Sequence, residues 1–88
     1  MKQIMLSAFS NTVRLNLIIC LSRKERNVAQ LVKNCGLSQS AVSQHLKKLR
    51  TAGVVATKRD GKEIYYYLVY PQAARLSRNL LSFIRIKK

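Results

Sequence analysis

The side chains best suited to chemistry in this chain are small hydroxyl, amide and amino groups between positions 38 and 48. Four of them follow the i, i+3, i+4, i+7 spacing that places residues on one face of a helix: Ser40, Ser43, Gln44 and Lys47. Almost every group on this face can donate or accept a hydrogen bond. Serine and glutamine can contact base edges, and lysine can contact guanine or phosphate, so the face suits the major groove of DNA.

The residues around this face favour a helix that begins at a tight turn. Ser38 follows Gly36-Leu37 and is a good N-cap, because its side-chain oxygen can accept from a backbone N–H of the first turn. Val42, Leu46 and Leu49 form the apolar stripe that would hold the helix to a core. We therefore add Ser38 to the candidate DNA contacts, with Gln39 and Lys48 as phosphate contacts.

The charge of the chain supports a polyanionic partner. Its 88 residues carry a net charge of +14, from 17 Lys and Arg against Glu25, Asp60 and Glu63. Double-stranded DNA is the leading candidate, and an anionic membrane surface is the alternative. The longest apolar run, Leu17 to Leu21, is far shorter than a membrane-spanning helix. We therefore expect no membrane partner. Two cysteines do not make a disulfide framework, so we expect the protein to lie in the cytoplasm.

The order of elements predicts a winged helix-turn-helix, a mostly α fold with a β-hairpin, as a single domain over residues 1–88. Helices are expected over 2–9, 12–21, 28–35, 38–53 and 71–86, and strands over 54–59 and 62–69. Gly36 is expected to end the third helix. Asp60-Gly61 predicts a hairpin with a type I′ turn, which needs positive φ at both positions.

The hairpin would form the wing. Alternation along the second strand places Ile64, Tyr66 and Leu68 on one face, which we expect to pack on the core. Tyr65 lies on the other face, with Arg59 and Lys62 near the tip. These three residues are the wing's candidate DNA contacts, to the backbone or the minor groove, against the alternative of a solvated hairpin tip.

From Asn11 to Leu68 the chain resembles the ArsR/SmtB-type bacterial transcriptional repressors. The matching segments are Val13-Arg14-Leu15, Leu37 to Leu46, Leu49 to Val55, Arg59 to Lys62 and Ile64-Tyr65-Tyr66, in the family's order. The resemblance implies a homodimer that binds an inverted-repeat operator and competes with transcription.

The chain departs from this family at its metal-binding motifs. Metal-sensing members carry a cysteine-rich motif where Glu25 to Leu31 has no cysteine. Other members bind zinc through Asp and His of the last helix, but Pro71 to Lys88 contains no Asp, Glu, His or Cys. A zinc site needs three or four ligands, so we expect no metal and no cofactor. His45, the single histidine, is interpreted as a packing or hydrogen-bonding residue, with a phosphate contact as the alternative.

The two cysteines allow a redox alternative. Some members of the resembled family sense oxidants with a cysteine of the second helix and one of the last helix. Cys20 is in a comparable place on the second helix, but the last helix has no cysteine. Cys35 lies on the apolar stripe of the third helix, where a small buried thiol is the ordinary explanation.

Surplus apolar residues on the first and last helices predict a dimer interface. The residues favoured for it are Phe9, Leu76, Leu80, Phe83 and Ile84. The alternative is a monomer in which they fold back on the central helix. A winged-helix module that binds protein or RNA is the second candidate function. An enzyme is not expected, because three acids, one histidine and no glycine-rich phosphate loop provide no catalytic set.

Overall fold

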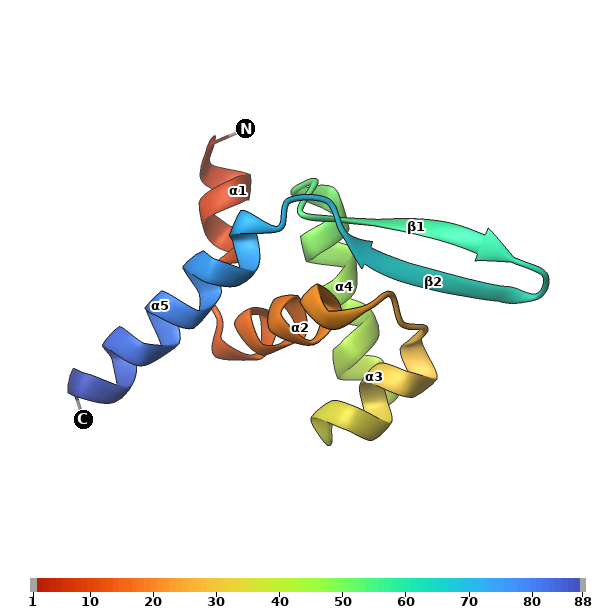
Figure 1. Ribbon diagram of the computed structural model, residues 1–88, viewed down its shortest axis with the longest axis horizontal. Helices are drawn as coiled ribbons and strands as arrows, with labels where there is room; N and C mark the ends of the chain where they lie inside the picture. The colour runs from red at the N-terminus through yellow and green to blue at the C-terminus, as the bar shows by residue number, and fades with distance from the viewer. Residues whose placement is uncertain (1, 88) are drawn as a thin grey trace.

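The computed structural model describes residues 2–87, except the side chains of Lys2, Cys35, Ile86 and Lys87. Its elements follow the predicted order: α1 (Lys2–Ala8), α2 (Thr12–Arg23), α3 (Val28–Cys35), α4 (Gln39–Thr51), β1 (Val55–Asp60), β2 (Glu63–Leu68) and α5 (Gln72–Lys87) (Figure 1). The predicted fold, mostly helical with one antiparallel hairpin, is confirmed. The boundaries differ slightly, since α2 runs two residues further than expected and α4 ends before Gly53. No helix within residues 2–87 is both long and apolar enough to cross a membrane.

Local hydrogen bonds explain where the helices begin and end. The Asn11 side chain accepts from the backbone N–H groups of Val13 and Arg14 and caps α2. Asn27 and Gln30 form a capping box at the start of α3. Gly36 ends α3 with a left-handed backbone, φ 67°, a conformation that glycine adopts without a Cβ clash. The turn between α3 and α4 is therefore encoded by its own residues.

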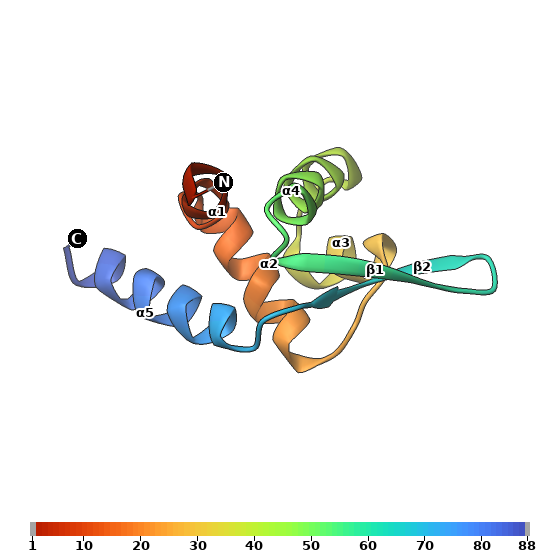
Figure 2. The same ribbon diagram turned by 90° about the horizontal axis from the view of Figure 1, so that it is seen from above.

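The core is built around α2. Helix α2 contributes Leu17, Ile18 and Leu21, α4 contributes its predicted apolar stripe, and α5 contributes Ala73 and Ala74. Figure 2 shows α1 and α4 on one side of α2 and α5 on the other. Removing a buried leucine from such a core typically costs about 2–5 kcal/mol of stability. This packing fixes the orientation of α4 relative to the rest of the domain.

The hairpin forms where it was predicted, but with a different turn. Strand pairing continues out to Asp60 opposite Glu63, so the loop is Gly61-Lys62. Gly61 has φ 64°, whereas no non-glycine residue of the described chain has positive φ. The predicted type I′ turn at Asp60-Gly61 is therefore wrong. Glycine at the first loop position and a negative φ at the second match a type II′ turn.

The wing is only partly covered by the core. Tyr66 and Leu68 pack against it as predicted, but Ile64 is 47% exposed. The expectation for Ile64 is wrong because the outer half of the hairpin extends beyond the helices (Figure 1). Near its base, Arg26 pairs with Tyr66 as an isolated antiparallel bridge, with N···O distances of 3.0 and 2.8 Å. This bridge joins the α2–α3 connection to the wing.

Candidate nucleic-acid interface

The predicted contacts of α4 lie together on its exposed face. Six of the candidate residues are solvent-exposed along this helix: Gln39, Ser40, Ser43, Gln44, Lys47 and Lys48. On its opposite side Val42, Leu46 and Leu49 are completely buried. The helix thus presents hydroxyl, amide and ammonium groups outward from a rigid support, and it contains no acidic residue.

Ser38 has a structural role that its place at the N-terminus of α4 predicts. Its Oγ accepts a hydrogen bond from the backbone N–H of Ala41 at 3.1 Å. The hydroxyl hydrogen is still available to donate to an acceptor such as a phosphate oxygen. Capping and a DNA contact are therefore compatible for Ser38.

The exposed face extends one turn further than the sequence analysis proposed. Arg50 lies three residues after Lys47 and is exposed, as is Thr51, four residues after Lys47. Both continue the same row of side chains toward the end of the helix. The i+3 and i+4 spacing was the signal that could have identified them.

A buried arginine of α2 connects α4 to α1. Arg14 is 5% exposed, and its guanidinium donates to the carbonyl oxygens of Ser7 at 2.8 Å and Ala8 at 3.3 Å. Its Nη1 lies 3.2 Å from Nδ1 of His45 on α4. Arginine can only donate, so Nδ1 of His45 accepts and carries no proton. Sequence reasoning missed this role of Arg14, since no local pattern distinguishes a buried arginine from an exposed one.

His45 is therefore a hydrogen-bonding residue, as interpreted from the sequence. Partial burial lowers the pKa of His45 below its ordinary value of 6.5, and the nearby charges of Arg14 and Lys48 lower the pKa further. The neutral ring is the form that can accept from Arg14. Protonation of His45 would break this hydrogen bond and place a positively charged imidazolium beside the guanidinium of Arg14.

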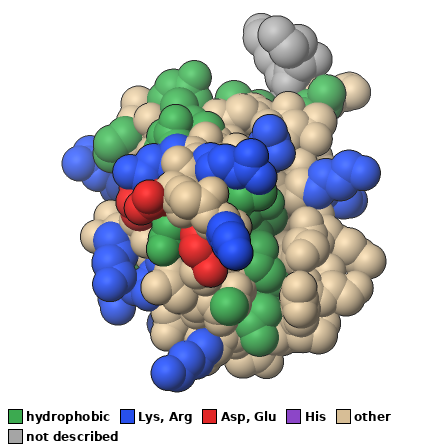
Figure 3. Space-filling model, turned by 90° about the vertical axis from the view of Figure 1, so that its right-hand side faces the viewer, with side chains coloured by type: hydrophobic (Ala, Val, Ile, Leu, Met, Phe, Trp, Pro, Cys, Tyr) green, Lys and Arg blue, Asp and Glu red, His purple; other side chains and the backbone are tan. Residues whose placement is uncertain are grey.

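The three acidic residues of the chain lie on or beside the wing, Asp60 and Glu63 on the hairpin and Glu25 in the α2–α3 connection. Glu25 pairs with Lys58 at 2.9 Å, and this hydrogen bond raises the pKa of Lys58. Glu63 accepts from the Asn27 amide at 3.4 Å, and Asp60 lies opposite Glu63 at the tip. Figure 3, which faces this end of the molecule, shows a few acidic side chains among several Lys and Arg. The wing is thus of mixed charge, unlike α4.

The candidate residues of the wing differ in exposure. Arg59 and Lys62 are exposed at the tip, whereas Tyr65 is half-buried. Tyr65 lies opposite Lys58 in the hairpin. The hairpin that carries these residues projects away from the helices (Figure 1).

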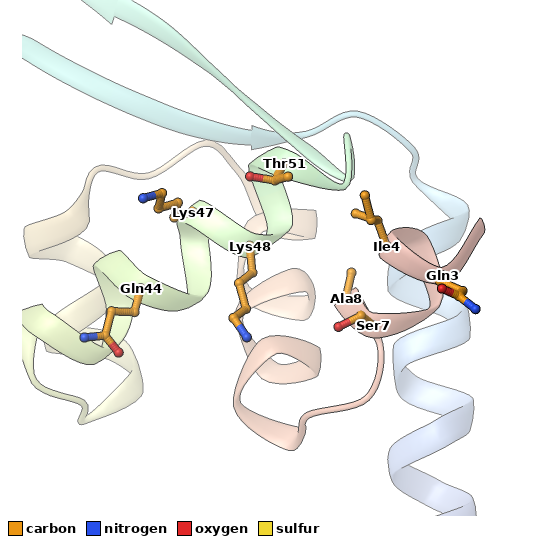
Figure 4. A pocket seen from close by; sticks show the side chains of 8 residues that line it. All are labelled: Gln3, Ile4, Ser7, Ala8, Gln44, Lys47, Lys48 and Thr51. Carbon is orange, nitrogen blue, oxygen red and sulfur yellow. The ribbon is translucent and has the colours of Figure 1, made fainter. Parts of the chain in front are cut away.

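A groove with a cavity volume of about 610 Å³ separates α1 from α4. We call it the α1–α4 groove, and its lining residues are Gln3, Ile4, Ser7 and Ala8 of α1 and Gln44, Lys47, Lys48 and Thr51 of α4. Figure 4 shows Lys48 extending from α4, while Ile4 and Ala8 project from α1 on the opposite side. Three predicted DNA contacts therefore also border a hollow that the sequence did not reveal.

The predicted dimer residues divide into two groups. Phe9 is half-buried and packs against the core, and Leu80 is half-buried on α5. Leu76, Phe83 and Ile84 are 44%, 57% and 38% exposed. The C-terminal half of α5 extends away from the other helices, as Figures 1 and 2 show.

Three further apolar residues near the chain's first and last helices are exposed and were not predicted from the sequence. Met5, Leu6 and Tyr70 are 38%, 70% and 46% exposed. Met5, Tyr70 and Leu76 also line a hollow of about 270 Å³ between α1 and α5. Composition alone could not separate these exposed apolar residues from core residues, because exposure is set by how the elements pack.

Among the described residues, no three or more His, Cys, Asp and Glu side chains are grouped closely enough to hold a metal ion. Cys20 is half-buried and packs against the core. The expectation for the thiol of Cys35 lies outside the described residues.

Comparisons with known proteins agree on the nature of this domain. Residues 11–57 match the model of a family described as bacterial regulatory protein, arsR family. The chain is 49% identical over 61 residues to the nodulation protein NolR of Rhizobium meliloti, which covers 69% of the chain and 50% of that protein. It is 39% identical over 72 residues to the biofilm growth-associated repressor of Xylella fastidiosa, which covers 82% of the chain and 63% of that protein.

A solved structure shows the same fold. The homodimeric winged helix-turn-helix DNA-binding domain of Mb0332 from Mycobacterium bovis, residues 1–100, is similar with a TM-score of 0.79 and 25% identity. The match covers 94% of this chain and 77% of that one. The curated relatives are longer, since the chain spans between half and two thirds of their length.

Proposed function

Because the chain belongs to the ArsR family of bacterial regulatory proteins, we propose that it is a sequence-specific regulator of transcription that binds double-stranded DNA. In this proposal it is a repressor that binds an inverted-repeat operator as a homodimer. The observation that carries the proposal is the exposed face of α4, which is free of acidic residues and backed by three fully buried side chains. Such a helix can enter the major groove without electrostatic repulsion from phosphates.

The proposed contacts divide by their chemistry. Ser40, Ser43 and Gln44 would contact base edges, because hydroxyl and amide groups discriminate hydrogen-bond patterns in the major groove. The exposed lysines and arginine of α4 would contact phosphates and set the register of the protein on the duplex. On the wing, Arg59, Lys62 and Tyr65 would contact the backbone or minor groove. The site of action would be the cytoplasm, where bacterial DNA lies.

The proposed homodimer rests on an apolar surface of α1 and α5, made by the exposed side chains of Met5, Leu76, Phe83 and Ile84. An apolar surface of this kind on a small domain is typical of a protein–protein interface. The similar domain from Mycobacterium bovis is described as homodimeric. A two-fold axis through this surface would repeat α4 on both sides, and the two recognition helices would face half-sites about 34 Å apart. Inverted symmetry of the operator would follow from this symmetry.

The proposal is tested by selecting binding sites from a pool of random duplex DNA with the full chain. We expect enrichment of one inverted repeat, bound more tightly than random duplex DNA at each of several salt concentrations. An RNA hairpin of equal length serves as a competitor. Enrichment of no sequence, or displacement of the duplex by equimolar RNA hairpin, would reject the proposal in favour of a protein- or RNA-binding module.

A further inference from the structure

The α1–α4 groove has the size and lining of a small-molecule site. Its volume of about 610 Å³ lies within the range of about 300–1,000 Å³ that is common for ligand pockets. On the α1 side, Ile4 is 47% exposed and Ala8 is nearly fully buried beneath the groove. An apolar group placed there would cover hydrocarbon that water now contacts, which is favourable.

The charged side chains that line the groove are all positive. Lys47 and Lys48 both line it, and no lining residue is acidic. Within the part of the chain that the structure describes, the one salt bridge joins Lys58 to Glu25, so neither groove lysine has an acidic partner. The groove therefore combines the exposed hydrocarbon of Ile4 on α1 with ammonium groups on α4 that have no acidic partner.

We propose that the α1–α4 groove binds a small organic carboxylate with an apolar body, such as an aromatic or medium-chain acid. The carboxylate would pair with Lys48, and the apolar body would lie against Ile4 and Ala8. A DNA phosphate would satisfy the lysines equally well, but it has no hydrocarbon to cover Ile4. The exposed hydrocarbon of Ile4 is what favours a carboxylate with an apolar body.

This inference rests on the proposed function for its regulatory consequence. Gln44, Lys47 and Lys48 line the groove and are also proposed DNA contacts. A ligand held by the same side chains binds the free protein better than the DNA complex. By linkage, such a ligand lowers the affinity for DNA by the factor by which DNA lowers the affinity for the ligand. The carboxylate would act as an inducer.

Binding is measured first without DNA, by titration calorimetry of the full chain with 2-naphthoate and with decanoate. We expect saturable binding of at least one acid and no binding of the neutral 2-naphthamide. Ile4→Ser and Lys48→Gln should each weaken binding about tenfold or more, since each removes one half of the proposed recognition. Leu6→Ser and Lys33→Gln are the matched controls and should leave affinity within about twofold of the original.

Several outcomes of this titration would overturn the site. These are the absence of saturable binding of both acids at millimolar concentration, equal binding of 2-naphthamide, and weakening by Leu6→Ser as large as that by Ile4→Ser. The last result would show that the ligand does not distinguish Ile4 in the groove from an exposed apolar side chain of α1 outside it. Thermal unfolding followed by circular dichroism checks that each variant is folded.

A measurement of DNA binding with and without the acid separates this inference from the proposed function. With a selected operator, the bound acid should raise the apparent dissociation constant of the DNA complex for the original chain and not for Ile4→Ser. Acid binding without any DNA binding would reject the proposed function and leave the site standing. DNA binding without acid binding would reject the acid site and leave the proposed function standing. Acid binding that leaves DNA affinity unchanged would overturn the inducer role.

Discussion

Nη1 of Arg14 lies 3.2 Å from Nδ1 of His45, and this contact joins the start of α2 to the middle of the exposed helix α4. The same guanidinium also donates to the backbone carbonyls of Ser7 and Ala8 at the end of α1. One side chain thus connects three helices beneath the candidate DNA-binding face. Its hydrogen bonds position α1 relative to α4 and so shape the groove between them.

Replacing Arg14 with methionine should destabilise the domain. Arg14→Met keeps an unbranched apolar stem but leaves the carbonyl of Ala8 without its donor, whereas the carbonyl of Ser7 still accepts from Ser10. An unpaired buried polar group costs about 1–3 kcal/mol. Urea unfolding followed by circular dichroism should show this loss, whereas the exposed control Arg23→Met should be close to the original chain. Equal stability of the two variants would contradict the role assigned to Arg14.

The stability of the domain should fall as the pH is lowered below 6.5. The pKa of His45 is lowered in the folded state, so the unfolded chain binds a proton at a higher pH than the folded chain does. Stability therefore rises with pH where the unfolded state holds more protons, and it is lost as the pH falls through the folded pKa.

His45→Gln provides the comparison for this pH dependence. His45 is the only histidine of the chain, so the variant removes the one imidazole that titrates in this range. Unfolding free energies measured between about pH 7 and pH 5 should decline less in the variant, because the unperturbed histidine pKa lies near 6.5. Parallel curves for the two proteins would show that His45 does not contribute to the pH dependence of the unfolding free energy.

Gln44→Ala and Lys48→Ala should have different effects on DNA binding. A lost base contact should cost about 1–3 kcal/mol at one operator position and relax the preference there. A lost phosphate contact should weaken binding to all duplexes and lower the salt slope by about one. Fluorescence anisotropy with operator and random DNA measures both. An unchanged ratio of affinities for Gln44→Ala would remove this residue from the base contacts.

A charge on the exposed side of α5 should separate the proposed dimer. Leu76→Lys or Phe83→Lys would place an ammonium group in an apolar interface, where burial of an unpaired charge is strongly unfavourable. Sedimentation equilibrium should then show a monomer where the original chain is a dimer. Ser82→Lys, on an exposed part of the same helix, is the control. A monomeric original chain at micromolar concentration would reject the dimer itself.

Zinc, cadmium and arsenite at stoichiometric amounts should leave operator binding unchanged. A metal shifts DNA affinity only if it binds the free and DNA-bound forms differently, and that requires a set of ligands. Each metal is titrated into the protein–operator complex while anisotropy is followed. Release at one metal per subunit, abolished in the double variant Cys20→Ser, Cys35→Ser, would instead make the two cysteines a sensor.

The local features of this protein could be predicted because they depend on near neighbours in the chain. Ser38 caps α4 through a hydrogen bond to a backbone group three residues away, and Gly36 ends α3 through its own φ angle. The exposed row of α4 follows from helical spacing alone. The resemblance carried by these same motifs predicted the family that the comparisons then showed.

The tertiary structure decided what depends on residues that are distant in sequence. Arg14 and His45 are 31 positions apart, so no local pattern predicts that they meet. Pairing of Asp60 with Glu63 moved the hairpin loop by one residue, and the limited extent of the core left Ile64 exposed. The α1–α4 groove likewise exists only because α2 holds two separate helices side by side. Helical periodicity and capping are set by short-range sterics and hydrogen bonds, whereas burial, register and cavities are set by how the elements pack.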